Sequence, residues 1–485
     1  MKTTNKILLL LAVSGMFVFS ACNKTTTPSS TSNLTKDYNS DVVTEWMNVF
    51  MTIDKDAIGY RPCPGPTGLA YMGLAVYEIC VPGMPEFNSI KGNWSGELHI
   101  PNPPSNQEIH YPTAVNAAYG YFMKNFFQNA RFATGKNSHI TNADAQLLIQ
   151  NKQLYFENLY ENEIHSSVFT NSKAWGEDVA RAVWDWYKTD KYAFDAHLNP
   201  RNTDPNKPLK FDWTTNSKDA SGNVIPGKWY PTNEGGDGGR FPLYGEARTF
   251  ATSSAEKLSI APYPYSDKPG SAFYGQALQV YHTCTSNMPF EDKWISEFWS
   301  DDNEGLTFSP PTRLIAILVQ ILEHDHVNLE KAAESVAKMG LGLNDYAVAC
   351  WYSKWHYNVE RPETYIKRNI DPNWEPYLID PESGTTGITP PFPAFPSGHS
   401  TFSGGGFAML THLFGGAYAF TDNCHKDRVE FIGKPRFFED FEEAGREDAF
   451  SRVTLGVHYS MDCEAGMKLG KAITGRIIKN IHWKK

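Results

Sequence analysis

Three short segments in the last third of the chain carry residue types that can bind a phosphate-like anion and move protons. The first segment, residues 354–362, reads Lys-Trp-His-Tyr-Asn-Val-Glu-Arg-Pro. Lys354 and Arg361 are seven residues apart, so a helix would place both cations on one face, two turns apart. Pro362 disfavours helical backbone at Arg361, and we expect the helix to end there. Taken alone, the pair also fits a solvated helix end, where the helix dipole favours cations.

The second segment is Pro396-Ser397-Gly398-His399, which precedes a stretch with helical periodicity. Gly398 lets the backbone approach a ligand closely, and free N–H groups at a helix start bind anions. The hydroxyl of Ser397 adds a donor, and His399 can transfer protons near neutral pH. By itself the segment could equally be an ordinary Pro-Ser helix cap beside an incidental histidine.

The third segment runs from Ser451 to Asp462 and contains Arg452 and His458. His458 and Asp462 are four residues apart, so one helix can hold them side by side, and the carboxylate can then fix the imidazole tautomer. Arg452 and His458 are six apart and do not share a helix face. If both contact one ligand, the helix must break between them, and Gly456 is the expected position. A surface His–Asp pair is the alternative.

Together the segments supply every group that an in-line reaction at a tetrahedral oxyanion, such as phosphate or vanadate, requires. Cations can surround the equatorial oxygens, and a hydroxyl and a backbone N–H add short donors. One histidine can bind on one axis while another acts as acid or base on the opposite axis. The equatorial cations are Lys354, Arg361 and Arg452, the short donors Ser397 and Gly398, the axial ligand His458 and the opposing acid/base His399.

The motifs Lys-x6-Arg-Pro, Pro-Ser-Gly-His and Ser-Arg-x5-His-x3-Asp, in this order, resemble the signature of the type 2 phosphatidic acid phosphatase and vanadium-dependent haloperoxidase superfamily. The resemblance implies an all-α fold of helical bundles, with Lys354, His399, His458 and Asp462 as catalytic residues. In the phosphatases the residue that matches His458 attacks phosphorus. In the haloperoxidases it is the single protein ligand of vanadium, and His399 would assist peroxide binding.

Several features favour the haloperoxidase branch. A long region precedes the site, and its segments 229–232, 261–266 and 295–299 resemble bacterial vanadium haloperoxidase homologues, so the similarity covers most of the mature chain. Phe392, in Phe-Pro-Ala-Phe-Pro, and Trp351, three residues before the motif lysine, also match haloperoxidase positions. Trp351 and Phe392 would then form part of a halide-side wall, although both could be plain core aromatics.

Two departures from the haloperoxidase pattern bear on the activity. Glu360 precedes Arg361 where the haloperoxidases usually have a bulky aromatic residue. A carboxylate there could pair with a cation of the site and weaken vanadate binding. The third motif also follows the second more closely than in the fungal enzymes.

Three functions stay open. In a haloperoxidase, vanadate is the cofactor, hydrogen peroxide oxidises a halide, and the positive charge of Lys354 activates the peroxide. In a phosphomonoesterase of the acid-phosphatase type, no cofactor is needed; His458 attacks a phosphate ester and His399 is the general acid. A non-catalytic surface lipoprotein would bind a partner through its helical globule, but the intact set of site residues argues against it.

The segments that must position these residues show mostly helical periodicity of their apolar residues. No segment convincingly alternates apolar and polar residues as a strand would. We expect an N-terminal helical region at 37–310 and a C-terminal helical domain at 311–485 that carries the site. Residues 197–268 are rich in Pro, Gly, Asn and Asp and lack a clear element, and loops that long are usually functional or wrap a surface. The helical stretches are 37–86, 114–132, 141–163, 172–189, 271–282, 293–299, 311–339, 344–361, 400–414, 439–453 and 458–481.

The N-terminus predicts export. Residues 1–21 have two lysines and then an apolar stretch of 13 residues from Ile7 to Phe19, which is typical of a signal peptide. Phe-Ser-Ala-Cys at 19–22 resembles a bacterial lipobox, which predicts lipidation of the Cys22 thiol. Residues 22–36 then form a flexible tether to a lipid anchor in the cell envelope, in the periplasm or on the outer membrane. An ordinary signal peptide is the alternative.

The composition of the chain limits the classes of ligand and metal that it is expected to bind. A formal net charge of −10 and the absence of a Lys/Arg-rich run argue against nucleic acid. The cysteines show no CxxC spacing, so we expect no structural zinc site. His324 and His326 point to different helix faces and are expected to be structural. Asp301, Asp302 and Glu304 lack the spacing of a calcium loop.

Overall fold

The computed structural model describes residues 33–94, 96–105, 107–133, 139–232, 238–381 and 383–485. The predicted signal peptide, Cys22 and most of the predicted tether lie outside these residues. Within the described ranges, no helix is long and apolar enough to cross a membrane.

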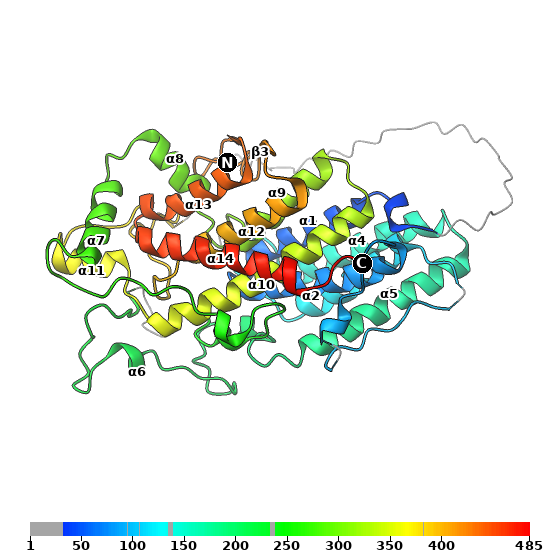
Figure 1. The fold of residues 1–485 in the computed structure, drawn as a ribbon, viewed down its shortest axis with the longest axis horizontal. Helices are drawn as coiled ribbons and strands as arrows, with labels where there is room; N and C mark the ends of the chain where they lie inside the picture. The colour runs from blue at the N-terminus through cyan, green and yellow to red at the C-terminus, as the bar shows by residue number, and fades with distance from the viewer. Residues whose placement is uncertain (1–32, 95, 106, 134–138, 233–237, 382) are drawn as a thin grey trace, which may run out of the picture. The chain divides into compact units, whose positions relative to one another are not determined.

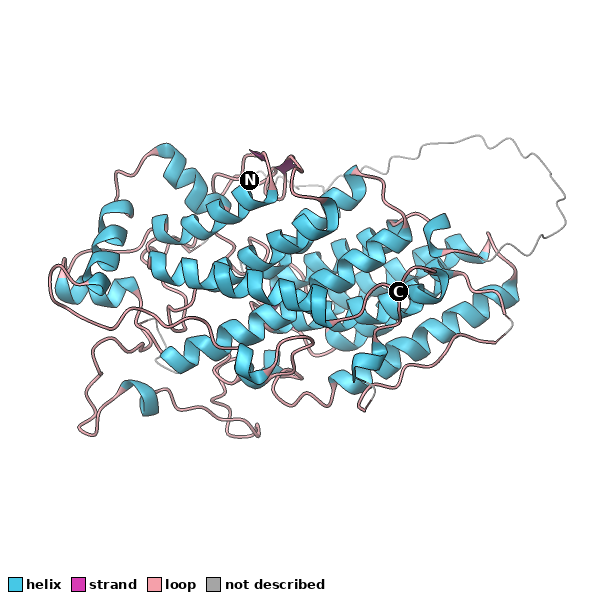
Figure 2. Ribbon diagram, in the orientation of Figure 1, coloured by secondary structure: helices cyan, strands magenta, loops and turns pink. Residues whose placement is uncertain are grey.

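Helices make up most of the ordered structure, which confirms the all-α prediction (Figures 1 and 2). The four strands within the described residues are two or three residues long and form two separate antiparallel pairs, β1 Ala57–Ile58 with β2 Arg131–Phe132 and β3 Phe420–Asp422 with β4 Arg436–Phe438. The helices are α1 Asp41–Asp56, α2 Pro64–Cys80, α3 Tyr111–Phe126, α4 Asn142–Glu161, α5 Ser166–Tyr187, α6 Thr214–Ser217, α7 Ala272–Thr283, α8 Phe290–Phe298, α9 Pro310–His324, α10 Leu329–Tyr357, α11 Pro362–Asn369, α12 Gly398–Phe414, α13 Phe441–Thr454 and α14 Ser460–Asn480.

Two of the predicted helical stretches are wrong in their continuity. The stretch 37–86 is divided into α1 and α2, and 311–339 is divided into α9 and α10. Between α9 and α10, His326 has a left-handed backbone with φ of 48°. Asn328 then caps α10 by accepting a hydrogen bond from the backbone N–H of Lys331. The structure also joins the predicted stretches around the Gly-Leu-Gly-Leu sequence at 340–343 into one helix, because packing outweighs the weak helix propensity of glycine.

α10 is the element against which much of the core packs. It lies against α2, α12 and α14. A Cβ atom at Gly73 of α2 would lie 2.8 Å from the carbonyl oxygen of Val336 in α10, so these two backbones approach closely. One hydrophobic cluster contains residues of α1–α5, α8–α10 and α12–α14. The division into two domains at residues 310 and 311 stays a prediction.

The long segment 197–268 contains, in its described part, the four-residue helix α6 and a few 3₁₀ turns. It is tied to α10 by hydrogen bonds. The backbone N–H of Ser259 donates to Ser353 Oγ at 2.9 Å. Asp345 accepts bonds from the backbone N–H groups of Phe250, Ala251 and Thr252 at 2.7–3.0 Å. The segment is therefore fixed along the helix that ends at the candidate site.

Candidate functional site

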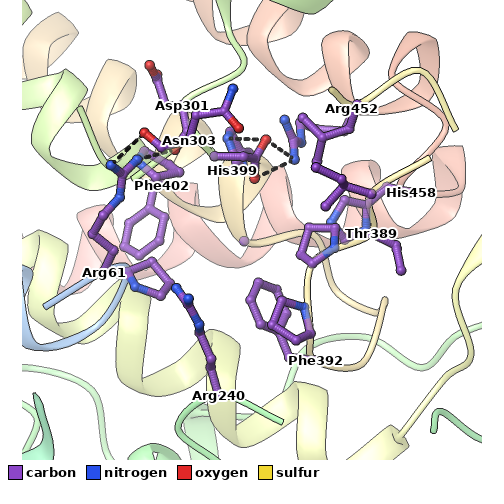
Figure 3. Close-up of a pocket in the computed structure, with 18 of the residues that line it drawn as sticks. Arg61, Arg240, Asp301, Asn303, Thr389, Phe392, His399, Phe402, Arg452 and His458 are labelled. Carbon is purple, nitrogen blue, oxygen red and sulfur yellow. Dashed lines mark hydrogen bonds and ion pairs between the residues drawn. The ribbon is translucent and has the colours of Figure 1, made fainter. Parts of the chain in front are cut away.

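Residues of the second and third sequence motifs line one cavity, although they are far apart in the chain (Figure 3). The cations of the first motif lie directly behind this lining, since Arg361 contacts His458 and Lys354 lies beside Gly398. The cavity has a volume of about 250 Å³. The C-terminal end of α10, the start of α12 and the connection between α13 and α14 bring the residues together. The predicted oxyanion-binding set is buried throughout and consists of Lys354, Arg361, Ser397, Gly398, His399, Arg452 and His458.

The first motif does not lie on a single helix, so the prediction that Lys354 and Arg361 share a helix face is wrong. α10 ends at Tyr357, where Asn358 turns the chain with φ of 52°. Asparagine tolerates this left-handed conformation better than most residues. Arg361 is instead the N-cap of α11, and Pro362 begins that helix rather than ending α10. Proline suits the first helical position because its missing N–H would have no partner there.

Both cations of the first motif are held by backbone oxygens. Lys354 Nζ donates to the carbonyl oxygens of Pro393 and Ala394 at 2.8 and 2.9 Å. Arg361 donates to the carbonyl oxygens of Phe392 and Val457 at 2.9 and 2.8 Å. Burial lowers the pKa of Lys354 to about 7 and that of Arg361 to about 9. A bound anion would therefore shift both groups toward their charged forms.

The second motif begins α12. The side chain of Ser397 caps this helix and accepts hydrogen bonds from Ser400 N–H at 3.3 Å and Ser400 Oγ at 2.9 Å. Gly398 is the first residue of α12. A Cβ atom at Gly398 would lie 3.7 Å from the Trp351 ring and 4.0 Å from Lys354 Cε. The glycine thus leaves open a space of about one methyl group beside the site lysine.

The third motif breaks between two helices. α13 ends at Thr454, and Gly456 turns the chain with φ of 77°, at the position that the sequence indicated. His458 lies just before α14, and Asp462 lies in its first turn, so the two do not share one helix. They still form a pair, since His458 Nδ1 lies 3.0 Å from Asp462 Oδ2. The other ring nitrogen, Nε2, lies 3.1 Å from Arg361 Nη1.

Several polar atoms of the site are buried without a hydrogen-bond partner among the described residues. Among them are Arg361 Nη2, Arg452 Nε and Nη1, and His399 Nε2, and the carboxylate oxygens Asp302 Oδ2 and Asp462 Oδ1 are likewise without a hydrogen bond. Such atoms are rare in native proteins because leaving a buried donor unpaired costs free energy. Unpaired guanidinium donors beside two histidines, together with the open space at Gly398, fit a tetrahedral oxyanion.

Both site histidines are held in their neutral form. Burial, followed by the positive charge of Arg452, lowers the pKa of His399 to about 3. Burial and the cations Arg361 and Lys354 lower the pKa of His458 well below its ordinary value. Burial raises the pKa of Asp462 to about 7. At neutral pH the two imidazoles can therefore accept a proton or donate a lone pair to a ligand.

Part of the cavity wall is apolar. Trp351 and Phe392 both line it, and their ring centroids lie 5.1 Å apart. Phe402, Pro390 and Pro391 complete this part of the wall. The structure thus puts the two aromatics of the predicted halide-side wall in the cavity, and their role there stays a prediction.

Asp302 is the main site residue that sequence reasoning missed. Its two carboxylate oxygens lie 3.1 and 2.9 Å from Arg452 Nη2, and Oδ2 lies 3.9 Å from His399 Nε2. Burial opposes ionisation of Asp302, but the positive charge of Arg452 outweighs it and lowers the pKa. Its neighbour Asp301 pairs with Arg313 and His425. No spacing links the acidic run 301–304 to the three motifs, so the sequence carries no signal that Asp302 belongs to the site. No group of His, Cys, Asp and Glu in the described part of the chain could hold a metal ion by itself.

Glu360 does not contact the site cations, so the expectation that it pairs with one of them is wrong, and its effect on vanadate affinity stays a prediction. Its carboxylate pairs with Arg368 at 2.6 Å and accepts hydrogen bonds from Thr364 Oγ1 and the backbone N–H of Gly227 at 3.1 Å. These partners lie on α11 and on the long segment 197–268. Glu360 is therefore neutralised outside the cavity.

Comparisons with known proteins agree with the motifs. Residues 334–483 match a family model described as the second helical-bundle domain of vanadium chloroperoxidase. The chain is 25% identical over 280 residues to vanadium chloroperoxidase from Curvularia inaequalis, which is 46% of each protein. It is 32% identical over 117 residues to a vanadium-dependent bromoperoxidase from Ascophyllum nodosum, which is 22% of this chain and 21% of that protein. The chain therefore aligns with less than half the length of these curated relatives.

Solved structures are similar to this chain over most of its length. A bacterial vanadium-dependent iodoperoxidase has a TM-score of 0.72 and 25% identity, and the match covers 92% of this chain and 96% of the other. A bacterial vanadium-dependent chloroperoxidase in its holo form has a TM-score of 0.60 at 14% identity over 94% of each chain, which shows a shared fold. Motifs, helical fold and relatives agree that residues 334–483 form a domain of the type found as the second helical bundle of vanadium chloroperoxidase, and that the chain is similar along most of its length to vanadium-dependent haloperoxidases.

Proposed function

We propose that the protein is a vanadate-dependent haloperoxidase. In this reaction hydrogen peroxide oxidises a halide, one proton is consumed, and the products are a hypohalous acid and water. The observation that carries the proposal is the set of buried, unpaired donors on Arg361 and Arg452 beside the neutral His458. Such a site favours an anion with several oxygens that stays bound.

Each residue of the site would have a separate role in binding vanadate. Lys354, Arg361 and Arg452 would neutralise the oxygens of vanadate, Ser397 and the backbone N–H of Gly398 would add hydrogen bonds, and His458 would be the protein ligand. Asp462 holds Nδ1 of His458, and Nε2, which lies 3.1 Å from Arg361 Nη1, would exchange this contact for the bound vanadate. When bound, vanadate supplies a Lewis acid that activates peroxide for attack by the halide.

His399 is suited to accept a proton from incoming peroxide. Its pKa of about 3 keeps it neutral, and its Nε2 has no hydrogen-bond partner in the described part of the chain. Once protonated, the ring would be stabilised by Asp302, whose Oδ2 lies 3.9 Å away. The proton could then be returned to the leaving oxygen as water forms. Trp351 and Phe392 would give the halide a partly dehydrated place beside the site.

A halide screen tests the proposal. Protein freed of phosphate is loaded with vanadate and assayed with hydrogen peroxide, a phenol dye and chloride, bromide or iodide. Halogenation should occur with at least one halide and should be lost in His458→Ala. His356→Ala is a matched control, because this exposed histidine lies two residues from Lys354 at the end of α10. Absence of halogenation with every halide would contradict the proposal.

A phosphomonoesterase is the second candidate, because the same donors could hold a phosphate ester and His458 could attack phosphorus. The low pKa of His399 speaks against it as general acid at neutral pH, since the proton would have to be acquired after the substrate binds. Hydrolysis of an aryl phosphate that is abolished by His458→Ala, with no halogenation, would favour the esterase.

We also propose that the mature protein is anchored in the cell envelope through a lipid on Cys22. The lipobox-like sequence at 19–22 is the support. Radiolabelled palmitate should be incorporated into the wild-type protein and not into Cys22→Ala. Release of unlabelled wild-type protein would favour an ordinary signal peptide, and binding of a partner by a protein without either activity would favour a non-catalytic surface lipoprotein.

A further inference from the structure

The long segment 197–268 has no role in the oxyanion site, yet it contributes two arginines to the cavity. Arg201 and Arg240 line the cavity and are partly exposed. The side chain of Arg240 has 32% of its surface exposed, whereas Arg61 and Arg452, which also line the cavity, are buried. The two loop arginines therefore stand where the cavity meets solvent.

Arg240 is fixed on the wall by its backbone. Its N–H donates to the carbonyl oxygen of Pro391 at 2.9 Å. Its carbonyl oxygen accepts a hydrogen bond from Trp351 Nε1 at 3.0 Å. Both partners belong to the apolar wall beside the oxyanion site. The Arg240 side chain extends from this fixed point into the cavity (Figure 3).

The next residue, Phe241, has a strained backbone conformation. Phe241 has φ of 57°, a conformation that a bulky residue rarely adopts. Its buried ring packs against Tyr244, and its N–H donates to the carbonyl oxygen of Pro200, beside Arg201. The two arginines thus stand on adjoining stretches of backbone. Strained backbone held in this way is concentrated at functional sites.

The Arg240 guanidinium has no close ion pair among the described residues of the cavity. Arg61 donates to the carbonyl oxygens of Asp301, Thr307 and Phe308 at 2.7–2.8 Å. Asp302 is paired with Arg452. Within the described residues, the charged contact of the Arg240 guanidinium is Glu304 at 3.5 Å, longer than an ordinary hydrogen bond. An incoming carboxylate could make the two parallel hydrogen bonds that Glu304 does not make.

The shape and lining of the cavity limit what accompanies that carboxylate. The wall includes the rings of Trp351, Phe392 and Phe402. The volume of about 250 Å³ lies below the range of about 300–1,000 Å³ typical of sites for drug-sized ligands, so a single-ring molecule fits best. An aromatic ring would lie against the apolar wall with its anionic end at the solvent side.

We propose that Arg240, assisted by Arg201, binds the carboxylate of a small phenolic substrate and so holds the ring that is halogenated next to the oxyanion site. A guanidinium is suited to this because its planar fork matches a carboxylate. The role of the bound phenol as halogen acceptor rests on the proposed haloperoxidase function. The binding itself does not require vanadate.

The test compares two probes of equal size, 3-(4-hydroxyphenyl)propionate and its uncharged amide. Binding to the full chain without vanadate is measured by calorimetry. The wild-type protein should bind the carboxylate about tenfold more tightly than the amide, as one charge-assisted pair allows. Arg240→Gln should abolish this difference, and Arg240→Lys should keep part of it. Arg446→Gln is the matched control, because this exposed arginine on α13 lies outside the cavity lining.

Equal binding of the two probes by the wild-type protein would overturn the proposal. A carboxylate preference that survives in Arg240→Gln would also overturn it. Halogenation rates with vanadate, peroxide and iodide should show the same carboxylate preference in kcat/KM. If no halogenation occurs but the binding difference depends on Arg240, the haloperoxidase function fails and the carboxylate subsite stands, so the two failures are distinguishable.

Discussion

Asp302 holds Arg452 in the site through both carboxylate oxygens, at 2.9 and 3.1 Å from Nη2. This pair leaves Nε and Nη1 of Arg452 unpaired among the described residues. The acidic residue from the loop before α9 thereby orients a cation from α13. The proposed oxyanion binding would therefore depend on a residue outside all three motifs.

Asp302→Asn should weaken vanadate binding by about tenfold or more, the effect usual for outer partners of metal-site ligands. Asparagine has the shape of aspartate but lacks its negative charge, so the variant loses the ion pair with Arg452. The bound anion must then order the guanidinium by itself. Titration with vanadate, followed by calorimetry, measures the change. Asp325→Asn, on the short turn after α9, is the control and should bind as the wild type does. Unchanged affinity in Asp302→Asn would show that Arg452 needs no such partner.

Gly398→Ala should leave the fold intact and reduce oxyanion affinity. The added methyl would make ordinary contacts of 3.7 Å with Trp351 and 4.0 Å with Lys354 Cε, so no clash destabilises the protein. It would instead fill the space that the oxyanion needs. We expect an unchanged melting temperature without anions and an affinity for phosphate or vanadate lower by about tenfold, since a misplaced ligand loses more than one charged hydrogen bond. Equal affinity in the variant and the wild type would mean that the anion lies elsewhere.

Glu360→Gln should not change vanadate affinity by more than about twofold, because Glu360 pairs with Arg368 and not with a site cation. It should lower the free energy of unfolding by about 1–3 kcal/mol, the usual cost when a buried charged hydrogen bond is weakened. Urea unfolding and vanadate titration measure the two effects separately. A marked gain in affinity would revive the view that Glu360 competes with the oxyanion.

Lys354 and Asp462 make opposite contributions to the pH dependence of stability in the absence of anions. Burial raises the pKa of Asp462 from its ordinary 3.8 to about 7, so between these values the folded state keeps a proton that the unfolded state releases, and the contribution of Asp462 to stability falls as pH rises. His399 and His458 have lowered pKa values and oppose this fall below neutral pH. Burial lowers the pKa of Lys354 from 10.5 to about 7, so above pH 7 the unfolded state keeps the extra proton, and stability rises with pH.

Melting temperatures measured across this pH range check the prediction. Asp462→Asn should make stability rise more steeply with pH below 7, because only the histidine contributions remain there, and should leave the rise on the alkaline side. Phosphate should stabilise the wild type most near pH 7, because it favours charged Lys354. The same slope below pH 7 in Asp462→Asn and in the wild type, or no rise above pH 7, would contradict these pKa directions.

The sequence predicted the all-α class and the break at Gly456, because periodicity and glycine conformation are local properties. It could not predict that α10 continues through Gly340, since this depends on packing against α2. It also placed Arg361 on the wrong helix, because the left-handed turn at Asn358 has no strong signal in the sequence. Asp302 was missed for a different reason: its partner Arg452 is distant in the chain, and only the tertiary fold brings them together.

The most direct test of the account is a titration of phosphate-free protein with vanadate, followed by 51V NMR and by iodide oxidation with peroxide. One vanadate should bind per chain, the bound signal should be lost in His458→Ala and kept in His356→Ala, and turnover should rise in proportion to the bound fraction. Vanadate that binds to His458→Ala as to the wild type, or that saturates the wild type without oxidising any halide, would contradict the claim that this site works as a vanadate-dependent haloperoxidase.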